Sequence, residues 1–232
     1  VLDRAEEAAP GQNPQMSLST VLGARIAALI EAQGPMSVAQ FMTIALHDPG
    51  AGYYATRDPI GAAGDFITAP EVSQMFGEML GLWCVQVWHD QGCPKNVRLA
   101  ELGPGRGTLM ADMLRAMAVA PEFLQSADIV LVEASPALRR VQEDKLKFSG
   151  VRPRWLPAFD ESLADRPLLL VANEFFDALP IRQYVRTERG WCERMVTALD
   201  GGLVFALAPV PVPAAAIPAS HDGAPPGGVY ET

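Results

Sequence analysis

The sequence predicts an α/β fold built on a Rossmann-like, mostly parallel β-sheet, and three observations lead to that prediction. Short apolar segments alternate with helical patterns, a glycine-rich turn joins the first segment to a helix, and an acidic residue ends the second segment. This alternation of strand, turn, helix and strand is typical of parallel sheets. The predicted strands are residues 97–102, 129–133, 151–156 and 167–172.

The helices between these strands are predicted from their periodicity and their first residues. Residues 108–118 follow the glycine-rich turn and form the first of them. Ser135 and Pro136 supply an N-cap and a first-turn proline for a later helix that carries Leu138 and Val141. Helices of this kind connect neighbouring parallel strands across one face of the sheet.

The part of the chain after these helices predicts one buried strand and a meander. The strand at 167–172 is apolar throughout, so we expect it to be buried on both faces. Three later segments, separated by short turns that contain glycine, predict an antiparallel meander that extends the sheet or forms a flap. These segments are residues 181–187, 191–197 and 203–207.

The residues before the sheet predict a small helical lobe. Leu22, Ile26 and Ile30 recur at helical spacing from residue 17 onward, and Ser37 can cap a second helix. We therefore expect a disordered amino terminus, a helical lobe with a loop, a sheet domain that includes the meander, and an extended segment rich in Pro, Ala and Gly. The corresponding boundaries are 1–16, 17–66, 67–207 and 208–232.

A capping box is predicted where the lobe meets the sheet domain. Thr68 is followed three positions later by Glu71, so the two side chains can bond to each other's backbone N–H groups and start a long helix. The apolar residues of that helix form one stripe, for which core packing is the favoured interpretation. The stripe comprises Val72, Met75, Phe76, Met79, Leu80 and Trp83.

Composition narrows the class of protein. The 232 residues carry 27 acidic and 18 basic side chains, a formal charge of −9, which disfavours nucleic acid as a partner. The 3 Cys and 3 His form no recognisable zinc motif, so no metal is expected. No apolar run is long enough to span a bilayer, so membrane insertion is not expected. We expect a bacterial cytoplasmic protein, with the mitochondrial matrix as the alternative, and the sequence indicates no oligomeric state.

The glycine-rich turn predicts the cofactor. A dinucleotide site needs the spacing Gly-x-Gly-x-x-Gly, but the position three residues beyond Gly105 is Thr108. The third glycine, Gly107, comes one place early, which favours S-adenosylmethionine over NAD because no pyrophosphate has to rest on the helix. Glu101 at the strand end can favour the cationic end of this ligand. The predicted contacts from this segment are Glu101, Gly103, Pro104, Gly105, Gly107 and Thr108.

A second acid supports the same ligand. Glu133 follows the second strand, where in crossover sheets an acid accepts hydrogen bonds from both hydroxyl groups of a ribose. A glycine-rich turn alone is a weak motif, whereas the turn combined with an acid in register is much more specific. We therefore predict an S-adenosylmethionine-binding protein.

Four motifs in order extend this prediction to a family. The chain resembles the MidA family of class I methyltransferases over residues 17–232, and family members continue beyond residues 227–231. The resemblance implies a protein-arginine N-methyltransferase that acts on a subunit of respiratory complex I and supports its assembly. It also implies that this chain is truncated at its carboxyl end and that its sheet is incomplete. The motifs are GYY at 52–54, GDFITAPEVSQ at 64–74, ELGPGRGT at 101–108 and NEFFDALP at 173–180.

With a guanidinium group as acceptor, the site needs carboxylates to hold the cation and take a proton. Glu174 is the expected clamp, Asp177 a second carboxylate and Asn173 an orienting amide, since all three follow the fourth strand. The alternative is that Asn173 and Asp177 only shape a turn. Asp65 and Thr68 are predicted to contact the cofactor from a lid, although a capping box alone explains Thr68.

Two other functions stay open at this stage. The cofactor half of such a fold does not specify the acceptor, so a small-molecule N- or O-methyltransferase is one alternative. A non-catalytic assembly factor that keeps the cofactor fold for docking is the other.

Overall fold

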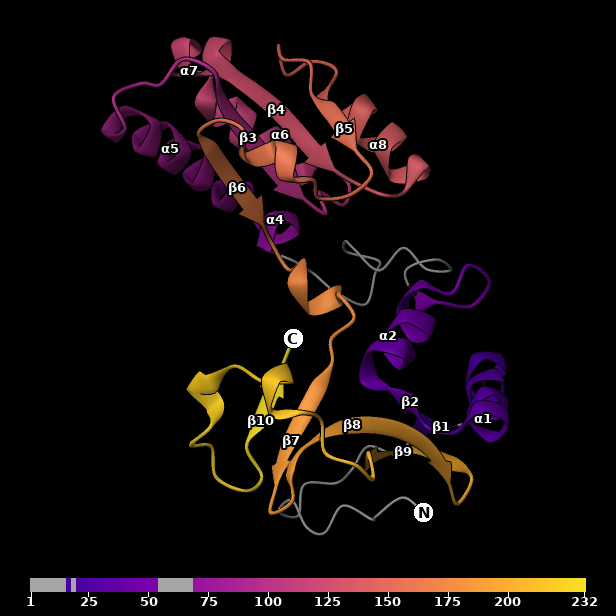
Figure 1. The fold of residues 1–232 in the computed structure, drawn as a ribbon. Coiled ribbons are helices and arrows are strands. Elements are labelled where there is room, and N and C mark those ends of the chain that lie inside the picture. The colour runs from indigo at the N-terminus through magenta and orange to yellow at the C-terminus, as the bar shows by residue number, and fades with distance from the viewer. Residues whose placement is uncertain (1–15, 18–19, 54–68) are drawn as a thin grey trace. The chain divides into compact units, whose positions relative to one another are not determined.

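The computed structural model describes residues 16–17, 20–53 and 69–232. The chain divides into two compact units, one formed by residues 58–177 and the other by residues 1–57 together with 178–232. Figure 1 shows both units with their helices and strands labelled. The predicted lid residues Asp65 and Thr68, and the predicted disordered segment up to residue 15, lie outside the described residues.

The unit of residues 58–177 contains the predicted parallel sheet. Its strands are β3 (Val97–Leu102), β4 (Ala127–Val132), β5 (Arg154–Leu156) and β6 (Leu168–Ala172). They pair in the order β5-β4-β3-β6, and every pair is parallel. The predicted α/β fold class is confirmed.

The central strand of this sheet is β3, and all six of its residues are buried. The expected burial of 167–172 on both faces is wrong, because β6 lies at the edge of the described sheet and Leu170 is exposed. The continuous apolar segment therefore predicted a strand correctly, but it did not predict that the strand lies at the edge of the described sheet.

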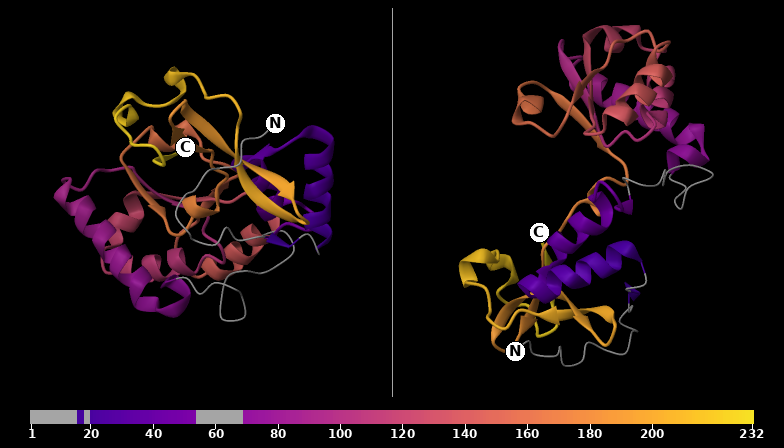
Figure 2. Two further views of the ribbon diagram at one scale, coloured as in Figure 1. Left: turned by 90° about the horizontal axis from the view of Figure 1, so that it is seen from below. Right: turned by 90° about the vertical axis from the view of Figure 1, so that its right-hand side faces the viewer.

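Helices cover one face of the parallel sheet (Figure 2). Leu99, Leu131 and Val171 point to this face and share a core with side chains of α5, α6 and α8. The opposite face carries a smaller cluster that includes Ala100 and Leu163. The helical elements of this unit are α4 (Ala69–Val72), α5 (Gln74–Asp90), α6 (Thr108–Met117), α7 (Pro121–Ser126), α8 (Pro136–Leu146), and the 3-10 turns η1 (Glu161–Ala164) and η2 (Phe176–Ala178).

Helix α5 packs against α6 through small residues, which contradicts the predicted core stripe. A Cβ atom at Gly77 would lie 2.6 Å from the Cβ of Asp112, and one at Gly81 would lie 2.6 Å from the carbonyl oxygen of Met113. These glycines let the helices approach closely, so the larger apolar side chains turn outward. Met75 is 68% exposed, and only Leu80 of the predicted stripe packs against the core. The exposed members are Val72, Met75, Phe76, Met79 and Trp83.

The second unit is an antiparallel sheet with two helices. Its elements are β1 (Met16–Ser17), α1 (Val21–Gln33), β2 (Met36–Ser37), α2 (Val38–His47), β7 (Gln183–Thr187), β8 (Gly190–Leu199), β9 (Gly202–Leu207), η3 (Ala214–Ala216), η4 (Ala219–His221) and β10 (Val229–Glu231). The strand order is β1-β9-β8-β7-β10, and β2 also pairs with β8. The predicted meander is confirmed as β7, β8 and β9.

The two amino-terminal helices pack on this meander. Ile26 and Ile30 of α1 form a core with Val196 of β8 and Leu203 of β9. The predicted cap of α2 is present, because the Ser37 hydroxyl accepts a hydrogen bond from the backbone N–H of Gln40 at 3.1 Å. A lobe predicted from helices alone thus completes its core with strands from the far end of the chain.

The division into units differs from the boundaries predicted from the sequence. The meander belongs with the amino-terminal helices, since β2 pairs with β8, and not with the parallel sheet. The segment 208–232 contains two 3-10 turns and ends in β10, which pairs with β7. Backbone pairing between distant segments decides both differences, and local composition carries no information about such pairing. Every helix in the described part of the chain is too short or too polar to cross a bilayer.

Candidate cofactor and acceptor site

The register of the parallel sheet brings the predicted motifs to one edge. Leu102, the last residue of β3, pairs with Val132 of β4 on one side and Ala172 of β6 on the other. Gly103, Glu133 and Asn173 are the next residues of these three strands. Because parallel strands end at the same edge, the glycine-rich turn, the second acid and the predicted acceptor loop all begin at one level (Figure 1).

The glycine-rich turn uses conformations that favour glycine. Gly103, Gly105 and Gly107 have φ angles of 59°, 53° and 77°. A Cβ atom at Gly103 would lie 2.5 Å from Cδ2 of Phe175, so the aromatic ring packs directly on bare backbone. Gly107 is the N-cap of α6 and donates its backbone N–H to the carbonyl of Pro104 at 2.7 Å. The turn therefore presents backbone and the amino terminus of a helix at the sheet edge.

Glu101 is buried, and the described residues give its carboxyl group no hydrogen-bond partner. Its side chain is on β3, the residue is 3% exposed, and its Oε2 atom has no partner within the described residues. Burial disfavours the charged form and raises the pKa of Glu101 to about 8. A carboxyl group held in this way favours any cationic group that reaches it, because the charge would gain the partner that the protein does not supply.

Glu133 differs from Glu101 because protein donors hold its carboxylate. Oε1 accepts from the backbone N–H of Ser135 at 2.8 Å, and Oε2 accepts from Nε2 of Gln142 at 3.2 Å. Arg139 donates from Nε to the main-chain carbonyl of Glu133 at 2.8 Å. A carboxylate has about four acceptor positions, so two remain for hydroxyl groups of a ligand.

The side chain of Thr108, at the start of α6, forms hydrogen bonds to residues of α4 and α8. Its hydroxyl donates to Oε1 of Glu71 in α4 at 2.7 Å and accepts from Nζ of Lys145 in α8 at 2.8 Å. Glu71 therefore contacts α6 through its side chain, and Ser73, with φ −146° and ψ 118°, separates α4 from α5. The single long helix expected after the capping box is interrupted at this residue.

The predicted acceptor residues follow β6, and Asp177 lies in the 3-10 turn η2. Asn173 is half-buried, and Glu174 and Asp177 are exposed. Across the described ranges, these three side chains form no hydrogen bond or ion pair, so no side-chain bond supports the interpretation that they only shape a turn. Glu174 has a φ of 47°, which costs a non-glycine residue about 1–3 kcal/mol. Strain of this kind is concentrated at functional sites.

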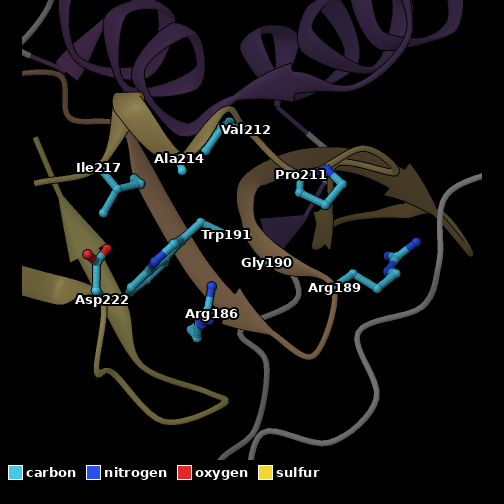
Figure 3. Close-up of a pocket in the computed structure, with 9 residues that line it drawn as sticks. All are labelled: Arg186, Arg189, Gly190, Trp191, Pro211, Val212, Ala214, Ile217 and Asp222. Atoms are coloured by element: carbon cyan, nitrogen blue, oxygen red, sulfur yellow. The ribbon is translucent and has the colours of Figure 1, made fainter. Parts of the chain in front are cut away.

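A pocket of about 410 Å³ lies elsewhere, in the unit that contains the antiparallel sheet. Figure 3 shows its wall, where the Arg186 guanidinium lies 5.9 Å from the centre of the Trp191 ring. The pocket shares no residue with the glycine-rich turn or with the ends of β3, β4 and β6. Its lining comprises Arg186, Arg189, Gly190, Trp191, Pro211, Val212, Ala214, Ile217 and Asp222. The predicted cofactor and acceptor residues that the structure describes do not line this pocket.

The sequence interpretation missed Gln142. It named Leu138 and Val141 as the apolar residues of this helix, yet Val141 is exposed and Gln142, the next residue, is fully buried. The spacing of Leu138, Gln142 and Leu146 was the available indication, because residues four apart share one face of a helix. Because glutamine is polar, it does not contribute to the apolar periodicity from which a buried helix face is predicted.

These features define a Rossmann-like protein whose candidate cofactor site lies at the carboxyl ends of its strands. A family model described as "Putative S-adenosyl-L-methionine-dependent methyltransferase" matches residues 79–231. The chain belongs to this family, and the family predicted from the motifs is confirmed.

Named relatives are similar over most of this chain. A protein arginine methyltransferase NDUFAF7, mitochondrial, from Danio rerio is 43% identical over 191 residues, which cover 74% of this chain and 45% of the relative. The protein of the same name from Homo sapiens is 38% identical over 217 residues, 83% of this chain and 49% of its own length. The chain thus spans about half the length of these relatives.

Solved structures share the fold. A crystal structure from Burkholderia thailandensis bound to S-adenosyl-homocysteine has a TM-score of 0.71 and 32% identity, and the match covers 91% of this chain and 55% of that one. A second crystal structure from the same organism has a TM-score of 0.67 and 34% identity, with 91% and 54% covered.

Proposed function

We propose that this protein binds S-adenosylmethionine at the carboxyl ends of β3 and β4 and transfers its methyl group to an arginine of a protein substrate. The observation that carries the proposal is Glu101, whose Oε2 is buried and unpartnered among the described residues beside the glycine-rich turn. The cationic end of the cofactor would supply the missing partner. The structure from Burkholderia thailandensis that resembles this chain holds the demethylated form of the same cofactor.

The residues at the sheet edge fit this ligand in three respects. Glu101 would face its cationic end, the two free acceptor positions of Glu133 would take ribose hydroxyls, and bare backbone at Gly103 to Gly107 permits close approach. The bound cofactor supplies an activated methyl group. Asp65 and Thr68, which belong to the same proposal, lie outside the described residues.

The acceptor side of the proposal rests on the loop after β6. Glu174 and Asp177 are exposed acids without an ion pair among the described residues, so their carboxylates are available to hold a guanidinium group and take a proton from it. Asn173 would orient the same group. The word arginine in the names of the relatives supports this choice of acceptor.

A finer proposal concerns the substrate and the compartment. We propose a subunit of respiratory complex I as the substrate, on the strength of the family resemblance, and methylation as a contribution to its assembly. The bacterial cytoplasm and the mitochondrial matrix are the two compartments considered, because the named relatives are mitochondrial and the similar crystal structures are bacterial. The cytoplasm is the proposed location.

Transfer of a labelled methyl group tests the function. The protein is incubated with labelled S-adenosylmethionine and either complex I subunits or a metabolite extract, and arginine in a protein product is expected to carry the label. Label only in the extract would contradict the protein substrate. Gly105→Val, which forces a branched side chain into a φ of 53°, is the control that should lose transfer. If complex assembly is unchanged in that variant, catalysis is not the function.

A further inference from the structure

Gln142 is a buried amide whose hydrogen bonds all go to the candidate cofactor site or its neighbouring strand. The residue is 0% exposed. Nε2 donates to the carbonyl of Gly105 at 2.7 Å and to Oε2 of Glu133 at 3.2 Å, and Oε1 accepts from Nε1 of Trp155 at 2.8 Å. Burying an amide is costly unless it is bonded, and here both ends are bonded.

Trp155 determines which way this amide points. An indole N–H can only donate, so the Gln142 oxygen must face Trp155 and its nitrogen must face the glycine-rich turn. In that orientation the two amide protons are directed to a main-chain carbonyl and a carboxylate, both acceptors. The orientation of the amide is therefore fixed by one hydrogen-bond donor, on Trp155, and two acceptors, on Gly105 and Glu133.

The amide links two segments that would contact different parts of one ligand. Gly105 is in the turn after β3, and Glu133 follows β4. A Cβ atom at Gly107 would lie 3.3 Å from Cγ of Gln142, so the turn and α8 are also in close contact. A glutamate at position 142 would put a second carboxylate beside Glu133, and the two like charges would repel.

We infer that Gln142 is a positioning residue that aims the Glu133 carboxylate at the ribose of the cofactor and holds it level with the glycine-rich turn. This inference rests on the proposed function. It predicts that the loss of Gln142 weakens recognition of the ribose hydroxyl groups specifically, in addition to any loss of folding stability.

The test compares two ligands in calorimetric titrations, S-adenosylhomocysteine and its 2′-deoxy analogue. In the unaltered protein the deoxy ligand is expected to bind about tenfold more weakly, since a hydrogen bond to a charged group has about this effect. Gln142→Met keeps the length of the side chain without its hydrogen bonds. In this variant the ratio of the dissociation constant of the deoxy analogue to that of S-adenosylhomocysteine should fall to about twofold. Trp155→Phe removes the bond that orients the amide together with part of the packing of the indole ring, and it should lower the ratio to an intermediate value.

Leu146→Ala is the matched control. Leu146 is buried one turn further along α8, so its truncation destabilises the same helix without touching the Glu133 carboxylate. The inference requires that this control keep the tenfold ratio. An equal drop of the ratio in the control, or an unchanged ratio in both Gln142→Met and Trp155→Phe, overturns it. If the unaltered protein binds neither ligand, the proposed function itself fails, and the inference fails with it.

Discussion

Replacing Glu101 with Gln is expected to abolish the pH dependence of cofactor binding. The amide has nearly the same size but cannot ionise. Because burial raises the pKa of Glu101 to about 8, only about a tenth of the ligand-free protein carries the charge at pH 7. A cationic group of the ligand selects the ionised form, so the unaltered protein should release a proton on binding below pH 8.

The size of the effect follows from the ionised fraction. With a pKa of about 8, the fraction of ionised Glu101 is about 1% at pH 6 and about 50% at pH 8. The apparent affinity scales with the fraction of protein that is competent to bind. The association constant for S-adenosylhomocysteine should therefore increase about ninefold from pH 6 to pH 7 and about fivefold from pH 7 to pH 8, and level off above pH 9.

The raised pKa of the Glu101 carboxyl group should have the opposite effect on folding stability, which decreases with pH while ligand affinity increases. Its ordinary pKa is 4.5, so between pH 4.5 and pH 8 the folded protein holds a proton that the unfolded chain has lost. The free energy of unfolding should fall as pH rises through this window, by up to about 1.4 kcal/mol per pH unit from this group. Glu101→Gln removes this pH-dependent decrease in the free energy of unfolding, because the amide does not titrate. The variant should be more stable than the unaltered protein at pH 8 while binding the ligand more weakly.

Isothermal titration with S-adenosylhomocysteine at pH 6, 7, 8 and 9, each in two buffers of different ionisation enthalpy, measures both the affinity and the protons released. Urea unfolding at the same pH values measures stability. Glu122→Gln, at an exposed acid in α7, is the matched control and should retain the full pH dependence. A flat affinity profile in the unaltered protein, or the same slope in Glu101→Gln, would refute the reasoning.

Three further substitutions probe other parts of the site and its support. Glu174→Gly should be more stable than Glu174→Ala by about 1 kcal/mol in urea unfolding, since glycine accepts a φ of 47°, while both lose methyl transfer; full transfer in either would exclude Glu174 as the acceptor clamp. Arg98→Met should lower the free energy of unfolding by about 2–4 kcal/mol, because it removes the buried guanidinium that lies 3.0 Å from Asp128. A decrease below about 0.5 kcal/mol, the usual size for a surface substitution, would show that this ion pair does not stabilise the fold. Gly103→Ala should weaken cofactor binding through its contact with Phe175, and pairing it with Phe175→Leu should recover part of the affinity.

Local features of the chain predicted the parallel sheet and brought the candidate site residues to one of its edges. Strand segments, the glycine spacing and the acids at 101 and 133 are encoded within a few residues of one another, and parallel pairing then brings their ends together. The cap of α2 at Ser37 is local for the same reason. Properties that depend on neighbouring residues alone were accessible to sequence reasoning.

Properties that depend on distant partners were not accessible. The stripe on α5 has the spacing of a core face, yet Gly77 and Gly81 allow so close an approach of α6 that the glycine face became the buried one. A hydrophobicity pattern favours large side chains and gives little weight to glycine, although a close helix contact needs it. The pairing of β2 with β8 is likewise set by residues about 160 positions apart in the chain.

The edge of the parallel sheet combines local choices that each reduce stability. Glu101 is an acid buried without a partner among the described residues, Glu174 has a left-handed backbone conformation, and three glycines in the turn after β3 have positive φ. Elsewhere in the same unit a buried charge, Arg98, is paired with Asp128 and Asp165. The buried charge at the start of β3 is thus paired, whereas the buried carboxyl group of Glu101 near its end has no partner among the described residues. The buried side-chain oxygen that has no partner among the described residues, Oε2 of Glu101, lies beside the glycine-rich turn, and a ligand that compensates it there explains why the acid is kept.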